Sequence, residues 1–254
     1  MLTQPTIEKL NTMKLGAMAK AFAEQMQRPD MAGLSFEERF GLLVDCQMTE
    51  LENRRMLNRL KSARLRLTAA IEDVDLRADR GLDRSHILSL SQNQWVRSHH
   101  NILITGPTGA GKSYLACALA HKACRDGHTV LYNRLPRLLH DLAIARHDGR
   151  YGKIMAQLAK CEVLLLDDLL ISPITQDDQR ELLEIVEERY DRRATVITSQ
   201  LPVKAWHDAM QDPTLADAIL DRLVHNAHKI ELKGKESMRR TRSTLDRKPE
   251  TVSL

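Results

Sequence analysis

The stretch at residues 101–116 constrains this chain most. It reads NILITGPTGAGKSYLA, an apolar run followed by a glycine-rich turn with the spacing G-x-x-x-x-G-K-S. The apolar run at 102–104 predicts a buried parallel strand, and the residues from Lys112 onward favour a helix. Glycines allow backbone amides to face an anion without a Cβ in the way, and the helix would add the positive end of its dipole. The stretch therefore predicts a phosphate loop that binds a nucleoside triphosphate.

Each residue type in this loop has an expected task. Lys112 would reach the β- and γ-phosphates of ATP, and the Ser113 hydroxyl would hold a magnesium ion, so ATP and Mg²⁺ are the expected cofactors. The expected nucleotide-binding residues are consecutive: Gly106, Pro107, Thr108, Gly109, Ala110, Gly111, Lys112, Ser113 and Tyr114. A chance glycine-rich loop is the alternative, and the strand before the loop and the helix after it argue against that alternative.

A second signal lies where four apolar residues, 163–166, are followed by Asp167 and Asp168. The carboxyl ends of parallel strands meet at one edge of a sheet, so this acidic pair is expected beside the phosphate loop. Asp167 would complete the Mg²⁺ site with Ser113, and Asp168 would orient or deprotonate the attacking water. The structural alternative is an Asp-Asp turn that caps the next helix.

From residue 101 onward, strands and helices alternate, which predicts an α/β fold with a five-stranded parallel sheet between helices. The strands are predicted at 102–104, 128–132, 163–168, 194–199 and 228–232. The helices are predicted from 112 and at 135–146, 151–160, 176–193 and 214–224. Thr175 would cap the helix at 176–193. Gln200 stands at the exit of the fourth strand, where its amide would hold the attacking water or bond the turn before Pro202.

The segment ahead of this alternating region reads as mostly helix. Ser35 and Glu38 have the spacing of a capping box that starts a new helix. On the second half of that helix one face is apolar, formed by Met56, Leu60, Ala63 and Leu67. Cations border this face on both edges. The helix could therefore pack on the domain or on a partner subunit while it presents positive charge.

These cations are candidate contacts to nucleic acid. Aromatic residues make up only 4% of the chain, so contact to the backbone of duplex DNA fits better than stacking on bases. The candidate DNA-binding residues lie on this helix and in the loop between two predicted helices: Arg54, Arg55, Arg59, Lys61, Arg64, Arg66, Arg146 and Arg150. An ordinary surface helix with solvated arginines is the alternative.

Composition limits the class of protein. The net charge is +4, and residues 229–254 hold eight Lys/Arg against four Asp/Glu, so the C-terminal segment alone equals the whole excess. A basic tail suggests a polyanionic partner, although it could simply be solvated. No apolar segment approaches the roughly 20 residues of a membrane span, and the N-terminus lacks the layout of a signal peptide. We therefore expect a cytoplasmic protein without membrane contact.

The same patterns divide the chain into four segments. We expect a helical domain for DNA or partner binding and self-association at 1–75, a linker at 76–98, an ATPase domain at 99–233 and a basic tail at 234–254. The four cysteines show no C-x-x-C pair, so core thiols are expected in place of a metal site or a disulfide. Trp95 and Val96 precede the first strand, where they would cover a nucleotide base or plug the edge of the core.

The whole pattern resembles the AAA+ ATPase core, and within it the IstB family. The similar stretches are Gly106-Pro-Thr-Gly-Ala-Gly-Lys-Ser113, Glu188-Arg-Tyr190, Thr198-Ser-Gln-Leu-Pro-Val203 with Trp206, Ala216-Asp-Ala-Ile-Leu-Asp-Arg-Leu-Val-His225, Met13-Lys-Leu-Gly-Ala-Met18 and Ala63-Arg64. IstB proteins are helper ATPases encoded beside the transposase in one class of bacterial insertion sequences. They are relatives of the replicative helicase loader DnaC.

The resemblance implies roles that the residues alone do not. Arg222 would be an arginine finger that enters the ATP site of the neighbouring subunit, Gln200 would be a first sensor, and Arg239 a possible second sensor. Lys235-Glu236 makes the local spacing one residue longer than the family pattern, and Leu169-Leu170 stands where the family usually has a glycine. Only 22 residues follow the last predicted strand, too few for the usual AAA+ C-terminal lid.

By this resemblance the expected function is that of an ATP-dependent helper. It would form a homo-oligomer on duplex DNA and recruit or activate the transposase encoded by the same element. A DnaC-like replicative helicase loader is the nearest alternative. A monomeric small-molecule kinase with the same phosphate loop is a second one. A third is a nucleotide-gated scaffold with negligible hydrolysis, because Asp168 is shorter than the glutamate that many AAA+ proteins use.

Overall fold

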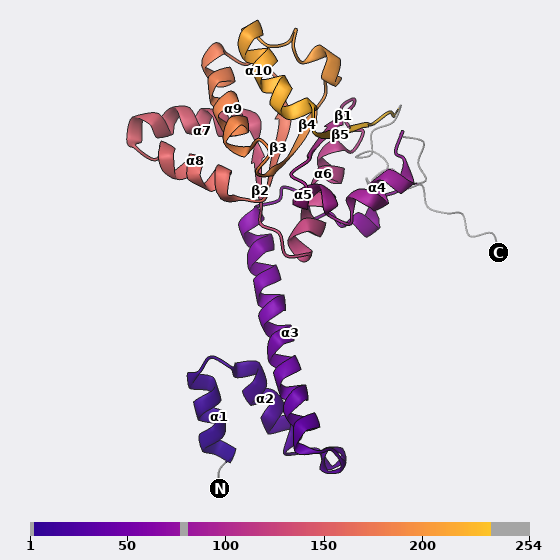
Figure 1. Ribbon diagram of the computed structural model, residues 1–254, viewed down its shortest axis with the longest axis vertical. Helices are drawn as coiled ribbons and strands as arrows, with labels where there is room; N and C mark the ends of the chain where they lie inside the picture. The colour runs from indigo at the N-terminus through magenta and orange to yellow at the C-terminus, as the bar shows by residue number, and fades with distance from the viewer. Residues whose placement is uncertain (1–2, 77–80, 235–254) are drawn as a thin grey trace, which may run out of the picture. The chain divides into compact units, whose positions relative to one another are not determined.

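The structure, a computed structural model, describes residues 3–76 and 81–234 (Figure 1). It divides into two compact units, Met1–Asn58 and Arg59–Leu254. Arg239 and nearly all of the predicted basic tail lie outside the described residues, as does the segment on which the expected absence of a lid depends. Within the described residues, no helix has the length and apolar character that crossing a membrane requires.

The N-terminal unit is helical. It contains α1 (Thr3–Thr12), α2 (Gly16–Gln25), the short 3-10 helix η1 (Pro29–Gly33) and most of α3 (Phe36–Ala63). The predicted capping box is confirmed at the start of α3. The Ser35 backbone N–H donates to Glu38 Oε2 at 2.8 Å, and the Glu38 N–H donates to Ser35 Oγ at 3.2 Å. These two bonds satisfy donors that the first turn of a helix leaves unpaired.

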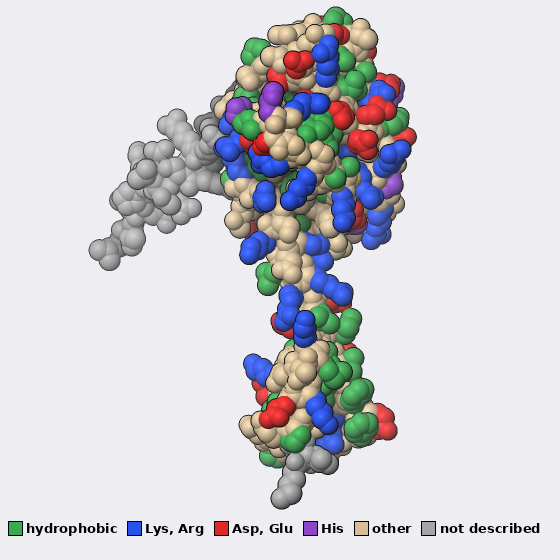
Figure 2. Space-filling view, turned by 90° about the vertical axis from the view of Figure 1, so that its left-hand side faces the viewer, with side chains coloured by type: hydrophobic (Ala, Val, Ile, Leu, Met, Phe, Trp, Pro, Cys, Tyr) green, Lys and Arg blue, Asp and Glu red, His purple; other side chains and the backbone are tan. Residues whose placement is uncertain are grey.

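This unit buries little. Among its described residues the buried side chains are Ala19, Leu43 and Gln47. Large apolar side chains remain exposed and gather along one side of the unit in Figure 2. The exposed large apolar residues of this unit are Met13, Met26, Phe36, Phe40, Leu42, Val44, Met48 and Leu57. An apolar surface of this kind marks an interaction site more often than an ordinary protein surface.

The end of α3 corrects one sequence prediction. The helix ends at Ala63, and Arg64 adopts a left-handed backbone with φ of 52°. Leu67 and Arg66 therefore do not lie on this helix, and the predicted apolar face stops at Ala63. Ala63 is fully buried and belongs to the core of the larger unit together with Ala69. The chain turns here because these residues pack against the helix that follows the phosphate loop.

The larger unit is built on five parallel strands, as predicted. They are β1 (Asn101–Thr105), β2 (Val130–Arg134), β3 (Val163–Leu169), β4 (Ala194–Ser199) and β5 (Ala227–Glu231). Their order in the sheet is β2-β3-β4-β1-β5. Successive residues of a strand point to opposite faces, so Ile102 and Ile104 join one core cluster and Leu103 the other.

Helices cover both faces of this sheet (Figure 1). One face packs against α6 (Lys112–Arg125), α4 (Arg84–Leu90), α5 (Gln94–Arg97) and the 3-10 helix η2 (Ile71–Asp73). The other face packs against α7 (Leu135–Asp148), α8 (Tyr151–Lys160), α9 (Gln176–Arg189) and α10 (Pro213–Val224), with the 3-10 helix η3 (Val203–Ala205) beside them. The result is a three-layer α/β/α arrangement.

The segment predicted as a linker contributes to the core. Ile87, Leu90, Trp95 and Val96 are buried in the same cluster as α6. The Trp95 indole N–H donates to the Leu90 carbonyl at 2.9 Å. Trp95 therefore plugs the core, which decides between the two roles that its position left open. Residues 59–76 also belong to the larger unit, so the first compact unit ends before the predicted boundary at residue 75.

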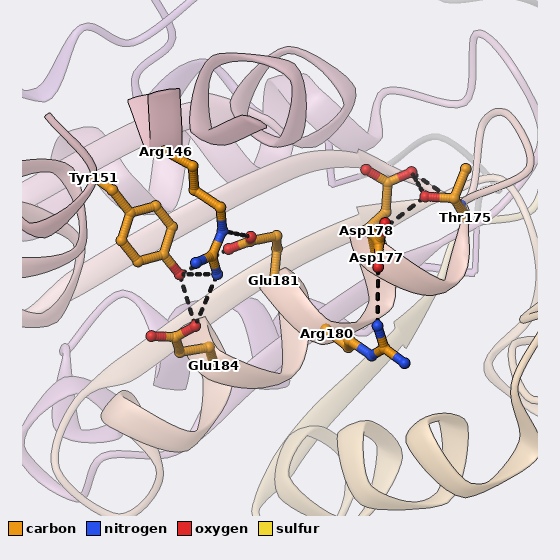
Figure 3. Close-up of polar contacts among 8 residues, drawn as sticks. All are labelled: Arg146, Tyr151, Thr175, Asp177, Asp178, Arg180, Glu181 and Glu184. Carbon is orange, nitrogen blue, oxygen red and sulfur yellow. Dashed lines mark hydrogen bonds and ion pairs between the residues drawn. The ribbon is translucent and has the colours of Figure 1, made fainter. Parts of the chain in front are cut away.

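Most element bounds agree with the sequence predictions, with informative shifts. The strand at 194–199 and the helix at 151–160 match, whereas β2 lies two residues later than predicted. Helix α9 begins after the Thr175 cap, whose bonds to Asp178 are drawn in Figure 3, and ends at Arg189 because Asp191 turns left-handed at φ of 53°.

Three cysteines, Cys117, Cys124 and Cys161, are buried as predicted; Cys46 is exposed, so its assignment to the core is wrong.

Candidate nucleotide site

The phosphate loop connects β1 to α6 at the carboxyl edge of the sheet. Gly106, Gly109 and Gly111 have φ of 143°, 84° and 95°, backbone conformations that other residues rarely adopt. At Gly106 a Cβ would lie 2.3 Å from the Leu232 carbonyl oxygen, just after β5. Glycine is therefore required there both for its conformation and for the close approach of a neighbouring strand.

Lys112, the first residue of α6, folds back over this loop. Its ammonium donates to the carbonyl oxygens of Gly106 at 2.8 Å and Pro107 at 2.9 Å. The side chain is buried. The ammonium therefore lies against the loop, and Lys112 is at the N-terminus of α6. A cation in this place can attract phosphate oxygens. The sequence prediction for Lys112 remains a prediction, and this geometry is compatible with it.

Ser113 and Asp167 meet, although 54 residues separate them. The Ser113 hydroxyl donates to Asp167 Oδ1 at 2.7 Å. The Thr198 hydroxyl, at the end of β4, donates to the same oxygen at 2.5 Å. A hydroxyl and a carboxylate are hard oxygen donors of the kind that Mg²⁺ prefers. The chemistry of this donor set therefore fits the predicted magnesium ion, which Ser113 and Asp167 would hold.

The other oxygen of Asp167 has its own partners. The Tyr132 hydroxyl, on β2, donates to Asp167 Oδ2 at 2.9 Å, and the Arg66 guanidinium lies 3.6 Å from the same atom. The Asp167 carboxylate is fully buried, so these contacts compensate for its lost hydration. Burial and the neighbouring Asp167 charge raise the pKa of the Tyr132 hydroxyl, which keeps it a donor.

Asp168 has an unusual backbone. Its φ is 68°, and the pairing of β3 with β4 shifts register between Leu166 and Leu169. Its N–H donates to Thr198 Oγ1 at 3.1 Å, while Arg134 Nε donates to its carboxylate at 2.7 Å and Arg66 lies 3.9 Å away. Strain of this kind is typical of functional sites. Because α9 is capped by Thr175, the alternative that this acidic pair caps the next helix is wrong.

Gln200 contacts the phosphate loop directly. Its Oε1 accepts a hydrogen bond from Thr108 Oγ1 at 2.8 Å. The Gln200 side chain therefore contacts the phosphate loop rather than the turn before Pro202. Its role toward water stays a prediction.

Arg222 lies at the opposite edge of the sheet. Its carbonyl oxygen accepts from Asn101 Nδ2 at 3.2 Å, and Asn101 is the first residue of β1. The five residues of β1 span about 13 Å at roughly 3.3 Å per residue, and the phosphate loop begins beyond them. The Arg222 guanidinium forms an ion pair with Glu187 on α9 and donates to the Ala218 carbonyl at 2.9 Å. It does not reach the phosphate loop of its own chain.

The predicted DNA contacts fall into two groups. Several are engaged within the protein: Arg54 pairs with Glu50, Arg59 donates to the Cys124 carbonyl, Arg66 approaches Asp167 and Asp168, and Arg150 pairs with Asp148. Arg146 donates to Glu181 at 2.5 Å, close to Glu184, and lies 4.0 Å over the Tyr151 ring (Figure 3). Arg55, Lys61 and Arg64 are exposed.

Four residues of this site were not predicted in their observed roles: Tyr132, Arg134, Thr198 and Arg66. Arg134 ends β2 and Thr198 nears the end of β4, so the rule that placed Asp167 at this edge applies to them as well. Predicting β2 two residues too early left Arg134 outside the strand, whereas Tyr132 was its predicted last residue and was given no role. Thr198 looks like an ordinary β-branched strand residue. Nothing in the sequence indicates that Arg66 would reach this edge.

Comparison with known proteins agrees with this geometry. The chain matches the family described as IstB-like ATP binding protein over residues 8–245. It is 52% identical over 240 residues to a Sinorhizobium fredii (strain NBRC 101917 / NGR234) protein named as insertion sequence ATP-binding protein y4pL, covering 94% of this chain and 98% of that one.

Solved structures show the same fold. The crystal structure of DnaI matches with a TM-score of 0.58 at 23% identity, over 66% of this chain and 92% of that one. The crystal structure of the DnaC helicase loader matches with a TM-score of 0.56 at 18% identity, over 65% and 97%. With the five-stranded sheet, these likenesses confirm the predicted AAA+ P-loop core.

Proposed function

This chain belongs to the IstB-like ATP binding protein family, and from that premise we propose that it is an ATP-dependent helper ATPase of transposition. It would form a homo-oligomer on duplex DNA and recruit or activate the transposase of its insertion sequence. The y4pL relative is named for an insertion sequence and for ATP binding, which supports this context. The partners and the assembly are the proposed part.

The observation that carries the proposal is the separation of the phosphate loop from Arg222. Lys112, Ser113 and Asp167 gather at the carboxyl edge of the sheet, whereas Arg222 lies at the amino edge. An arginine finger supplied in trans can raise the rate of phosphoryl transfer greatly. Two copies related by a head-to-tail interface would bring the two edges together. ATP binding and self-assembly would then depend on each other.

The carboxyl edge has room for such a finger. A hollow of about 340 Å³ opens beside Asp168, between α7 and the segment that follows β3. Asp168 and Asp178 line it, together with Pro136 and His140. Two carboxylates in one hollow favour a guanidinium from a neighbouring copy. We assign this hollow to the entry of Arg222 from the next subunit.

Within this site each residue of the chain has one proposed task. Lys112 and the loop amides would bind and orient the triphosphate, and Gln200 and Asp168 would place the attacking water. Ser113 and Asp167 would hold Mg²⁺, which, when bound, would neutralise charge on the phosphate oxygens. These tasks are mostly positioning and electrostatic stabilisation, in keeping with phosphoryl transfer.

The test is nucleotide-dependent assembly on DNA. Wild-type protein, duplex DNA and a non-hydrolysable ATP analogue should give large particles in sedimentation and electron microscopy, and these particles should retain the transposase of the element. Lys112→Ala should abolish assembly. Lys122→Ala is the matched control, because the Lys122 ammonium lies in the last turns of α6, away from the phosphate loop, and pairs with Asp126 just after the helix. This variant should assemble normally. Wild-type protein that stays monomeric with nucleotide and DNA would refute the proposal.

A DnaC-like helicase loader is the second candidate. The fold match to the DnaC helicase loader favours it, but it concerns the fold alone. A pull-down with the transposase in one arm and the bacterial replicative helicase in the other separates the two. Retention of the helicase and not of the transposase would make the loader the better assignment.

A further inference from the structure

Arg66 is the cation that the sequence places on a DNA-binding helix and the structure places at the nucleotide site. It lies three residues after α3 ends at Ala63. The left-handed turn at Arg64 carries the chain across to α6. Residues 66 and 67 then run beside Cys117, which is fully buried. This turn places Arg66 beside the nucleotide site, although its side chain remains 46% exposed.

The contacts of Arg66 converge on the two predicted catalytic carboxylates. Its NH1 atom lies 3.6 Å from Asp167 Oδ2 and 3.9 Å from Asp168 Oδ2. Tyr132 joins them, because its hydroxyl donates to Asp167 Oδ2 at 2.9 Å. Arg66 and Tyr132 therefore both act on one oxygen of Asp167.

The opposite oxygen of Asp167 is the one that faces the predicted metal position. Oδ1 accepts from Ser113 at 2.7 Å and from Thr198 at 2.5 Å. Arg66 thus does not occupy the place between Ser113 and Asp167. It holds the far side of the carboxylate, as the outer partners of metal-binding side chains do, and fixes which oxygen points inward.

We propose that Arg66, acting with Tyr132, is a positioning residue of the nucleotide site that orients Asp167 for Mg²⁺ and links it to Asp168. It is not a contact to DNA phosphate. The proposal rests on the proposed use of Mg²⁺–ATP by this site. Loss of Arg66 would leave a fully buried carboxylate with one hydrogen bond on its outer oxygen, so its orientation would depend on Ser113, Thr198 and Tyr132 alone.

The test measures the metal dependence of nucleotide binding in the full chain. A fluorescent ATP analogue is titrated with Mg²⁺, and the concentration that gives half-maximal binding is recorded. Removal of an outer partner typically costs about 10–100-fold in metal affinity, so Arg66→Ala should raise this concentration by that factor. Arg66→Lys, which keeps the charge, should recover most of the loss. Tyr132→Phe should shift it in the same direction by less.

Arg137→Ala is the matched control. Arg137 is an exposed cation at the start of α7 that pairs with Asp141, so its loss changes the local charge without touching either carboxylate. It should leave the Mg²⁺ dependence within about twofold of wild type, since surface pairs of this kind contribute little. Thermal melting without nucleotide confirms that each variant is folded. Should Arg66→Ala not fold, Arg66→Gln removes the charge in its place, and an unchanged Mg²⁺ dependence in both Arg66→Gln and Tyr132→Phe would contradict the proposal.

A DNA-binding measurement decides against the rival role. Each phosphate contact contributes about 0.9 to the slope of log affinity against log salt for duplex DNA. Arg66→Ala should leave this slope unchanged. A slope lower by about one, with an unchanged Mg²⁺ dependence, would overturn the proposal and return Arg66 to the DNA surface. If wild-type protein itself shows no Mg²⁺-dependent nucleotide binding, the proposed function fails and not the role of Arg66 alone.

Discussion

The two edges of the β-sheet use charge in opposite ways. At the carboxyl edge, the buried carboxylate of Asp167 is surrounded by hydroxyl donors and a cation. At the amino edge, two arginines make contrasting contacts. Arg189 is only 2% exposed and donates mainly to backbone carbonyls, whereas Arg222 is partly exposed and pairs with Glu187.

This difference separates two uses of arginine on one edge. Burial lowers the pKa of Arg189. Its guanidinium donates to backbone carbonyls at the start of β3 and β4, which is a structural role. Arg222 is held by one ion pair near solvent, where a neighbouring copy could reach it. The proposed shared site needs the second kind of arginine at the amino edge and the carboxylates at the carboxyl edge. Substitutions at the amino edge and at the carboxyl edge test the two sides of this comparison.

The largest effect is expected for Arg222→Ala. Loss of an arginine finger typically costs 10³–10⁵-fold in turnover, so ATP hydrolysis on DNA should fall by about that factor. Nucleotide binding by the isolated subunit should not change, because Arg222 lies far from its own phosphate loop. Arg180→Ala is the control, since Arg180 pairs only locally with Asp177 (Figure 3).

A mixing experiment makes this prediction sharper. Neither Lys112→Ala nor Arg222→Ala alone should hydrolyse ATP, but an equal mixture should form intact sites between unlike subunits. An intact site would form where an Arg222→Ala subunit binds ATP and a neighbouring Lys112→Ala subunit, which should not assemble by itself, supplies its Arg222. Partial recovery of turnover is expected. A mixture as inactive as its components would contradict a site shared between copies.

Part of the carboxyl edge can be predicted well from the sequence. The pairing of Ser113 with Asp167 follows from one rule, that parallel strands end at the same edge, because local patterns identify β1 and β3 reliably. Arg66 could not be predicted, since its place depends on the turn at Arg64 and on packing against α6. Arg146 shows the converse error: its charge is visible in the sequence, but Glu181, 35 residues away, is not visible as its partner.

Arg189 should affect stability and not catalysis. In Arg189→Met the carbonyls of Leu158, Cys161 and Ala194 lose their donor. Buried acceptors without partners cost about 1–3 kcal/mol each, partly offset because a buried charge is removed, so the free energy of unfolding should fall by about 2–4 kcal/mol. Urea denaturation measures this. Arg192→Met, at an exposed neighbour, should change stability little; an equal loss in both variants would argue against the structural role.

At the carboxyl edge, Thr198 should matter for catalysis. Its hydroxyl donates to Asp167 and accepts from the Asp168 N–H. Thr198→Val keeps the shape and removes both bonds. Turnover should fall by about 10–100-fold, as for other partners of metal-binding side chains. Thr198→Ser keeps the hydroxyl and should retain most of the activity. If valine and serine behaved alike, the hydroxyl would have no role in holding the acidic pair.

The smallest effect is expected for the change of stability with pH, through histidines at the amino end of the sheet. His228 on β5 lies 5.6 Å from the His86 ring, on α4, and 5.5 Å from the His100 ring, ahead of β1. Burial lowers the pKa of His228 below its ordinary value, and the charges of His86 and His100 lower it further. The folded protein therefore favours neutral His228, while the unfolded chain takes up the proton first as the pH falls.

The sign of the effect follows from that difference. The unfolded state binds more protons below the ordinary pKa of 6.5, so stability should be complete above it and should decline as the pH falls toward the lowered pKa. Urea midpoints between pH 7.5 and about 5.5, above the range where most carboxylates titrate, would record this decline. His228→Gln should flatten it, whereas His225→Gln, at an exposed histidine paired with Asp221, should not. An unchanged pH profile in His228→Gln would exclude the three-histidine contact as the source of the decline.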